Sequence, residues 1–410
     1  MKTTYRETTL PNGLRIAAEC DPNAASAAVG LFVATGARDE PQHLMGVSHF
    51  LEHMAFKGSA TRQANEVNEA FDRIGAQNNA FTSHEMTAYH AHVLPEHCGE
   101  SLALVADLLR PALREEDFQQ ERQVILEEIA MYEDNPFWVV YERALEAYFQ
   151  DHPLGCRVLG TNESVSALTR EQMSHYFKER YSPANTVLAA AGKVDFDAIV
   201  AQAASETQGW TSSCVTREYP QWSPSTGSIT IELEKATRGY MVLLWPAPAQ
   251  ASHARYAAML CAQIIGDSEG SRLYWALVET GIAVHAAVAF QGRDGCGECV
   301  ASVVCATEDL ARAEQIVRDE CKKLSESLTE DDLVRARSKI ATAVAMAGES
   351  PAGRMQRLGT LLTSTGVFRP LDEELTIING LTLDDLKKHL HEFPYSPLVV
   401  ARAVPLSKQA

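Results

Sequence analysis

The sequence contains one pattern twice, and this repeat limits the folds that the 410-residue chain can adopt. Leu113-Arg-Glu-Glu-Asp-Phe118 aligns with Leu328-Thr-Glu-Asp-Asp-Leu333 at an offset of 328 − 113 = 215 residues. Four further pairs match at this offset: Arg122 and Arg337, Ile125 and Ile340, Met131 and Met346, Pro136 and Pro351. A helix and its proline-containing exit therefore recur, as expected for domains that arose by duplication.

A second pair of segments supports the repeat. Leu168–Met173 (LTREQM) aligns with Leu381–Leu386 (LTLDDL) at an offset of 381 − 168 = 213 residues. Each segment leads into an apolar run, Thr186–Gly192 in the first copy and Pro397–Ala403 in the second. Two elements in the same order at nearly one offset predict two homologous domains.

The two copies are separated by a segment of different composition. Residues 209–226 are rich in Ser, Thr and Pro, which is typical of a linker. We therefore expect an N-terminal domain at residues 1–208 and a C-terminal homologous domain at residues 227–410. A chain of this length is also expected to form two domains from its size alone.

Both copies contain strand and helix patterns. Thr82–Val93 and Cys299–Cys305 alternate between apolar and polar residues, and Phe118–Tyr132 has helical periodicity. Strands and helices do not follow one another in regular alternation. The sequence therefore predicts an α+β fold in which each domain has an antiparallel-rich sheet with packed helices.

The composition excludes several classes of partner. The chain has 36 basic and 54 acidic residues, and its formal charge of −18 disfavours nucleic acid and anionic membranes. No apolar run is long enough for a membrane span, and the N-terminal residues have no signal-peptide pattern. Nine cysteines, an odd number without regular spacing, favour reduced thiols. We expect a cytoplasmic protein.

Residues 46–59, GVSHFLEHMAFKGS, place titratable groups among apolar residues. On a helix His49 and His53 share one face, and Glu52 lies nearly on that face. Zinc accepts imidazole and carboxylate ligands, and a catalytic site has three protein ligands and an open position. Glu52 could then act as a general base toward water at the metal. The alternative is a chance pattern in which the histidines are satisfied at a packing interface.

The predicted helix 118–132 could supply the third ligand. Five of its residues form one stripe: Phe118, Glu121, Ile125, Glu128 and Tyr132. A buried carboxylate must be paired, protonated or bound to a metal. In the second copy Ala336 and Ala343 align with Glu121 and Glu128, so the fold does not need these charges. A structural ion pair with Arg or Lys is the alternative.

These residues resemble the pitrilysin/insulinase family of zinc peptidases, in the branch of short chains that includes the mitochondrial processing peptidase. In that family a glutamate ligand follows the HxxEH helix at the distance found here, 128 − 53 = 75 residues, and another glutamate precedes it by 128 − 121 = 7 residues. The resemblance implies that His49, His53 and Glu128 bind one zinc ion. It further implies that Glu52 is the general base and that Glu121 orients a ligand.

The resemblance also indicates where a substrate binds. Residues 78–89 look like the family's edge strand, on which an extended peptide pairs as an added strand next to the metal. Asn79, Ala80 and Phe81 are the candidates for substrate contact. From the residues alone, an ordinary internal strand is equally compatible with this pattern.

The resemblance implies a zinc-dependent endopeptidase that cleaves extended peptides or short unfolded segments. One alternative is a non-catalytic subunit, because the family also contains core proteins of respiratory complexes. Another is a thiol redox protein that uses the CxxC pair Cys296 and Cys299. His90 and His92 share a strand face, but no third ligand is evident, so we interpret them as strand surface.

The chain departs from the family pattern in its second half. Members usually have an arginine there, followed 285 − 278 = 7 residues later by a tyrosine, and both reach the substrate. Here Val278 stands at the arginine position, and Val284 or His285 at the tyrosine position. Short members supply half of a four-domain chamber, so a dimer is expected. A paralogue that lacks HxxEH but retains the arginine and tyrosine would complete it, which favours a heterodimer; donation by His285 would support a homodimer.

Overall fold

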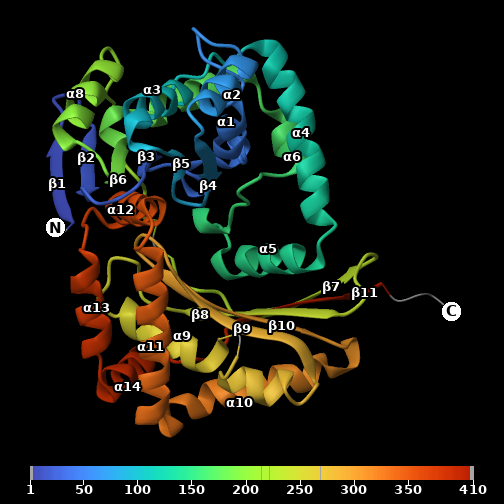
Figure 1. Ribbon diagram of the computed structural model, residues 1–410. Helices are drawn as coiled ribbons and strands as arrows, with labels where there is room; N and C mark the ends of the chain where they lie inside the picture. Colours follow the sequence, from blue (N-terminus) through green and yellow to red (C-terminus); the bar gives the residue numbers. More distant parts are fainter. Residues whose placement is uncertain (1–2, 214, 221, 268, 407–410) are drawn as a thin grey trace. The chain divides into compact units, whose positions relative to one another are not determined.

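The computed structural model describes residues 3–406 except 214, 221 and 268, so Cys214 and two positions of the predicted linker lie outside the described residues. The chain divides into two compact units, and each unit includes segments from both copies of the repeat (Figure 1). Unit 1 comprises Met1–Ile129, Cys156–Glu218 and Ala345–Pro370; unit 2 comprises Ala130–Gly155, Tyr219–Val344 and Leu371–Ala410.

Unit 1 is built on a six-stranded sheet with the order β1-β2-β6-β3-β5-β4. The β2–β6 pair is parallel and the other pairs are antiparallel. The strands are β1 (Thr4–Thr9), β2 (Arg15–Cys20), β3 (Ala27–Val33), β4 (Gln77–Thr82), β5 (Thr87–Val93) and β6 (Thr186–Gly192). This order places β4 at one edge of the sheet.

Helices cover both faces of this sheet because alternate strand residues are apolar on each side. One face packs against α2 (Ala64–Arg73), α3 (Cys98–Leu108) and α8 (Phe196–Glu206). The opposite face packs against α12 (Pro351–Thr365), a helix from the second copy of the repeat. Gly359 of α12 lies against the Phe32 ring, where a Cβ atom would approach the ring to 2.1 Å.

A separate apolar cluster in unit 1 joins the two helices that carry the predicted ligands. It contains residues of α1 (Val47–Ala55), α4 (Glu115–Glu133), α6 (Asn162–Ala167) and α7 (Arg170–Arg180). At its centre the rings of Phe50 and Phe118 stack with centroids 4.7 Å apart and planes 9° from parallel. This stack fixes α1 against α4.

Unit 2 repeats the arrangement with a five-stranded sheet, in the order β7-β11-β8-β10-β9. The strands are β7 (Gly227–Leu233), β8 (Gly239–Pro246), β9 (Ala283–Gly292), β10 (Gly297–Cys305) and β11 (Val399–Pro405). One face packs against a group of helices, and the other packs against α5 (Pro136–Phe149). The group comprises α9 (Arg255–Gly266), α10 (Leu310–Ser327), α11 (Glu330–Ala347), α13 (Leu371–Gly380) and α14 (Leu383–Glu392).

The repeated prolines explain how the units come to share the chain. Pro136 and Pro351 occupy the first turns of α5 and α12, where a missing amide costs nothing. Each helix then covers a sheet formed mainly by the other copy. The compact units are therefore not contiguous in sequence, unlike the domains 1–208 and 227–410 expected from the repeat.

The α+β class, with antiparallel-rich sheets and packed helices, is confirmed. The pattern at 82–93 was only partly a strand: Thr82 ends β4, and β5 begins at Thr87 after a turn. The turn forms because the Ser83 hydroxyl accepts hydrogen bonds from the amides of Glu85 and Met86. Among the described helices, none is both long and apolar enough to cross a membrane.

Candidate active site

Helix α1 carries the histidine pair, and a buried carboxylate fixes its first turn. The helix follows Gly46, whose φ of 93° is left-handed and where a Cβ atom would lie 2.6 Å from the carbonyl oxygen of Leu159. Glu40 accepts hydrogen bonds from the amides of Gly46 and Ser48 at 2.7 and 2.8 Å. These amides have no partner within the helix, so Glu40 acts as its cap and defines the position of His49.

The structure brings the three predicted ligands together. The Nε2 atoms of His49 and His53 lie 3.8 and 3.5 Å from Oε2 of Glu128. One ligand atom from each residue can be chosen so that all lie within 4.8 Å of one another. Within the described residues, this is the one group of three His, Cys, Asp or Glu side chains found with such spacing. Its members come from α1 and α4, which the stack of Phe50 on Phe118 holds together.

The state of His49 suits metal binding. Its side chain is buried, and its Nδ1 atom has no hydrogen-bond partner among the described residues. Burial, followed by the charge of His53, lowers the pKa of His49 to about 3. The ring is therefore neutral near pH 7 and offers a lone pair. Two neutral imidazoles and one carboxylate with an open fourth position are a donor set that fits catalytic zinc.

Glu121 lies behind the second histidine. Its Oε2 atom accepts a hydrogen bond from Nδ1 of His53 at 3.1 Å. Burial opposes the negative charge, but the hydrogen bonds from His53 and Lys57 outweigh it and lower the pKa of Glu121. Because a carboxylate can only accept, Nδ1 carries the proton and Nε2 of His53 is left to face Glu128.

Glu52 lies on the same helix as the histidines, with its side chain largely removed from solvent. Its Oε2 atom accepts a hydrogen bond of 2.6 Å from the hydroxyl of Thr82, the last residue of β4. Burial raises the pKa of Glu52, and neither the Thr82 bond nor the charge of His53 cancels this effect. A carboxylate whose pKa is raised toward neutrality is a better proton acceptor at pH 7.

The predicted substrate residues lie on the edge strand β4. Among the described strands β4 pairs with β5 alone, and Asn79, Ala80 and Phe81 lie opposite His90, Tyr89 and Ala88. The Asn79 side chain accepts a hydrogen bond from the Ala80 amide at 2.9 Å. The Phe81 ring packs edge-on to Phe32 at 6.5 Å, so it is partly committed to the core.

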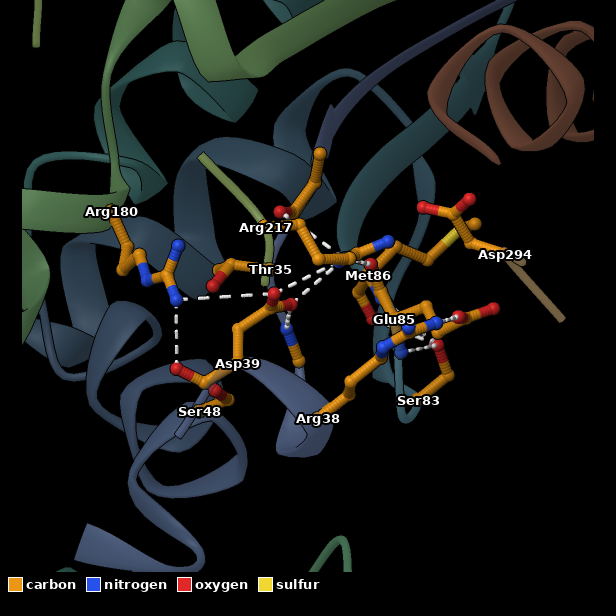
Figure 2. A network of polar contacts seen from close by, with 12 residues as sticks. Thr35, Arg38, Asp39, Ser48, Ser83, Glu85, Met86, Arg180, Arg217 and Asp294 are labelled. Atoms are coloured by element: carbon orange, nitrogen blue, oxygen red, sulfur yellow. Dashed lines mark hydrogen bonds and ion pairs between the residues drawn. The ribbon is translucent and has the colours of Figure 1, made fainter. Parts of the chain in front are cut away.

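A buried polar network lies beside this site and connects its elements (Figure 2). Arg38, in the turn η1 (Ala37–Asp39), forms an ion pair of 2.5 Å with Glu85 of the β4–β5 turn. Asp39 receives two hydrogen bonds from Arg217, at 2.9 and 2.8 Å. Arg217 also donates to the carbonyl oxygen of Glu85 at 2.8 Å, and Arg180 donates to that of Asp39. The network fixes the loop before Glu40 against the turn that ends β4.

Hydroxyl groups connect the same loop directly to α1. The Tyr176 hydroxyl lies 3.2 Å from that of Thr35 and 2.9 Å from that of Ser48. Ser48 precedes His49, so the ligand helix and the loop share a rigid support. Rigid supporting contacts of this kind are what a site needs to hold its ligands in a fixed geometry.

The other candidate groups do not form a second site. Cys299 is buried, and burial raises its pKa to about 12 despite a hydrogen bond with Tyr395. Its thiol is thus a poor nucleophile. His92 is bonded to Ser26 at 2.8 Å, and neither His90 nor His92 belongs to a group of three potential ligands within the described residues. The eight cysteines that the structure describes are all free thiols.

The positions of the missing arginine and tyrosine lie in unit 2. Val278 ends the short π-helix η6 (Tyr274–Val278) and packs against the core. Val284 in β9 is 57% exposed. His285 is exposed, and its Nε2 atom lies 3.1 Å from the Ser302 hydroxyl on β10. None of these side chains carries the positive charge of an arginine.

Three residues of the site were missed by the sequence reasoning: Glu40, Lys57 and Thr82. Lys57 lies within the segment that carries the HxxEH pattern, so its neighbourhood to the site was visible. Glu40 and Thr82 are distant in sequence and act through backbone amides or a single oxygen atom. No spacing rule in one sequence identifies such contacts.

Comparison with known proteins supports the geometry. The family model "Insulinase (Peptidase family M16)" matches residues 15–162, and "Peptidase M16 inactive domain" matches residues 167–340. A protein of Rickettsia felis named an uncharacterized zinc protease is 32% identical over 393 residues, which cover 94% of each chain. The chain belongs to the insulinase family. The resemblance read from the HxxEH segment is thereby confirmed.

Solved structures agree with this insulinase-family fold. A protease from Helicobacter pylori superposes with a TM-score of 0.91 at 19% identity, covering 98% of this chain and 100% of that one. A chain of complex III2 from Candida albicans gives a TM-score of 0.85 at 20% identity, covering 97% and 95%. At these identities the likeness shows the fold alone, and the fold serves both a protease and a respiratory complex.

Proposed function

We propose that this insulinase-family chain is a zinc-dependent endopeptidase that cleaves extended peptides, with Glu52 as its general base. The observation that carries the proposal is the convergence of His49, His53 and Glu128 within 4.8 Å of one another. The C-terminal copy has Ala336 and Ala343 where Glu121 and Glu128 stand, so these carboxylates are not required by the fold.

His49, His53 and Glu128 would hold one zinc ion. When bound, zinc supplies Lewis acidity that polarises the scissile carbonyl and activates water. The protein prepares for this with a neutral His49 ring, with a His53 ring oriented by Glu121, and with the negative charge of Glu128. The α1–α4 packing keeps these three donors in place before any metal arrives.

Glu52 would move the proton. Its Oε2 atom is engaged by the Thr82 hydroxyl, so Oε1 is the oxygen that accepts a proton from water and later returns it to the leaving amine. The raised pKa of Glu52, caused by burial, supports both halves of this transfer. Thr82 also ties the base to β4, so base and bound peptide would keep a constant separation.

The free edge of β4 would bind the peptide as an added strand. Main-chain hydrogen bonds on an edge strand accept any extended sequence. The Ala80 amide, now bonded to the Asn79 side chain, would be released to a substrate carbonyl. Asn79, Ala80 and Phe81 are therefore the proposed substrate contacts.

We further propose that the substrate chamber forms between two chains. Val278 and Val284 supply no donor for the scissile carbonyl, and a missing oxyanion donor costs about 10²–10³ in rate. A heterodimer with a paralogue that retains the arginine and tyrosine would restore it; His285 is the residue that could serve in a homodimer. The test is to assay the pure protein, and then its mixture with the paralogue. Full activity of a homodimer alone would contradict the heterodimer.

A non-catalytic subunit is the second candidate, because a chain of complex III2 has the same fold. The preserved His49, His53 and Glu128 group argues against it, since a scaffold gains nothing from a costly buried charge cluster. A cytoplasmic location is consistent with the proposed activity and is likewise part of the proposal.

The experiment that tests the proposal measures bound zinc and peptide hydrolysis together. We expect about one zinc per chain, and hydrolysis that a chelator abolishes and zinc restores. His49→Ala and Glu128→Gln should lose both, whereas Glu127→Gln, a matched change of an exposed neighbour on α4, should lose neither. Zinc that survives both ligand changes would contradict the proposed site.

A further inference from the structure

Lys57 makes a contact with the site that the proposed reaction has not yet used. Its Nζ atom lies 2.5 Å from Oε1 of Glu121, whose other oxygen accepts the hydrogen bond from His53. The Glu121 carboxylate is only 6% exposed and the Lys57 side chain 31%. One buried carboxylate therefore has two partners, a proposed ligand on one side and a cation on the other.

The backbone around Lys57 is fixed, so its side chain starts from a defined place. Lys57 donates its amide to the carbonyl oxygen of Met54 in the last turn of α1. Arg114 donates to the carbonyl oxygens of Lys57 and Ser59 at 3.1 and 2.7 Å. Between them Gly58 has a φ of +101°, and a Cβ atom there would lie 2.3 Å from a carbonyl oxygen. This turn is built to hold one conformation.

The arrangement has a consequence for His53. A carboxylate that receives hydrogen bonds on both oxygens cannot rotate freely, so Oε2 keeps its direction toward Nδ1 of His53. Without Lys57, Glu121 could turn both oxygens toward His53 or away from it, and its buried charge would lose its closest cation. The imidazole would then be held less firmly in the orientation that presents Nε2 beside Glu128.

We propose that Lys57 is a positioning residue that acts through Glu121 to hold the His53 ring in its metal-binding orientation. The inference rests on the proposed zinc site and deepens it. Lys57 touches neither metal nor substrate; its effect reaches the site only along the path Lys57–Glu121–His53. Loss of supporting contacts to a metal ligand weakens metal affinity by about 10–100-fold, and we expect about 10-fold for Lys57→Met.

The test is a double-mutant cycle on the zinc dissociation constant, measured by competition with a chromophoric chelator on the full chain. Its members are wild type, Lys57→Met, Glu121→Gln and the double variant. If Lys57 acts through Glu121, Lys57→Met weakens zinc binding about 10-fold in the wild type and has little further effect once Glu121→Gln is present. Lys57→Arg should keep affinity near the wild-type value, because it retains a cation that can reach Oε1.

Two comparisons separate this inference from general destabilisation. Lys178→Met, the same change at an exposed lysine of α7, should leave zinc affinity unchanged. Lys57→Gln, a milder change that keeps a donor, tests the same position if Lys57→Met fails to fold. Lys57 variants that bind zinc within twofold of wild type would overturn the inference, and so would equal effects of Lys57→Met in both backgrounds. A wild-type chain that binds no zinc would instead refute the proposed function itself.

Discussion

The buried ion pair between Arg217 and Asp39 predicts a large loss of stability from one substitution in a segment that looks like a flexible linker. The Asp39 side chain is 1% exposed and the Arg217 side chain 12%. In Arg217→Ala the aspartate loses two hydrogen bonds and its closest cation, while the Glu85 carbonyl oxygen loses a donor. Breaking a buried pair by removing one partner costs about 3–5 kcal/mol.

Asp39 keeps one compensating contact, because it also accepts a hydrogen bond from the Gly36 amide at 3.1 Å. We therefore expect the lower end of the range, about 3 kcal/mol in the free energy of unfolding. The assay is urea unfolding followed by circular dichroism. Arg6 offers a matched control, because it makes the same two-bond contact to Asp197 at 2.9 and 2.8 Å.

The control differs from the buried pair in exposure alone. The side chains of Arg6 and Asp197 are 44% and 75% exposed, so Arg6→Ala should cost far less than Arg217→Ala. Equal losses for the two variants would refute the argument that burial makes the Arg217 contact important. Because the network supports Glu40 and the β4–β5 turn, Arg217→Ala should also weaken zinc binding.

Three further predictions test other parts of the structure. Gly58→Ala should cost about 1–3 kcal/mol of stability, because φ is +101° and the new Cβ would lie 2.3 Å from a carbonyl oxygen, whereas Gly75→Ala at φ +60° meets no atom within 4 Å and should cost less in the same thermal melt. Cys299, whose pKa burial raises to about 12, should resist iodoacetamide at pH 8 until the protein is unfolded, as mass spectrometry of the labelled peptide would show; rapid labelling of the native chain would contradict its burial. Burial lowers the pKa of His389 to about 4 from an ordinary 6.5, so only the unfolded chain takes up this proton between those values, and stability should fall as the pH drops from 6.5 to 4. His389→Phe should flatten that part of the stability curve, and an unchanged curve would count against the assignment.

Much of the site could be predicted from the sequence because its chemistry is carried by short-range spacing. Two histidines four residues apart must share a helix face, and the 128 − 53 = 75 spacing selected Glu128 rather than its neighbours. The repeat identified the two charges that the fold does not need. It also identified Pro136 and Pro351 as equivalent, and both begin corresponding helices.

The contacts that could not be predicted depend on tertiary packing. The exchange of α5 and α12 between the units depends on which sheet each apolar helix face covers, and both faces look alike in sequence. Arg217 falls in a segment whose composition is typical of a mobile linker, yet it completes a buried network with Asp39. Thr82 orients Glu52 through a single hydroxyl, which no periodicity reveals.

The central claim is that Glu52 acts as a general base at a zinc site formed by His49, His53 and Glu128. Its most direct test is the hydrolysis rate of an internally quenched peptide by wild type and by Glu52→Gln, each loaded with one equivalent of zinc and each assayed in the active assembly. Glu52→Gln should bind zinc as tightly as wild type and lose about 10²–10⁴ of the rate. A zinc-loaded Glu52→Gln variant that cleaves the peptide at the wild-type rate would contradict the account.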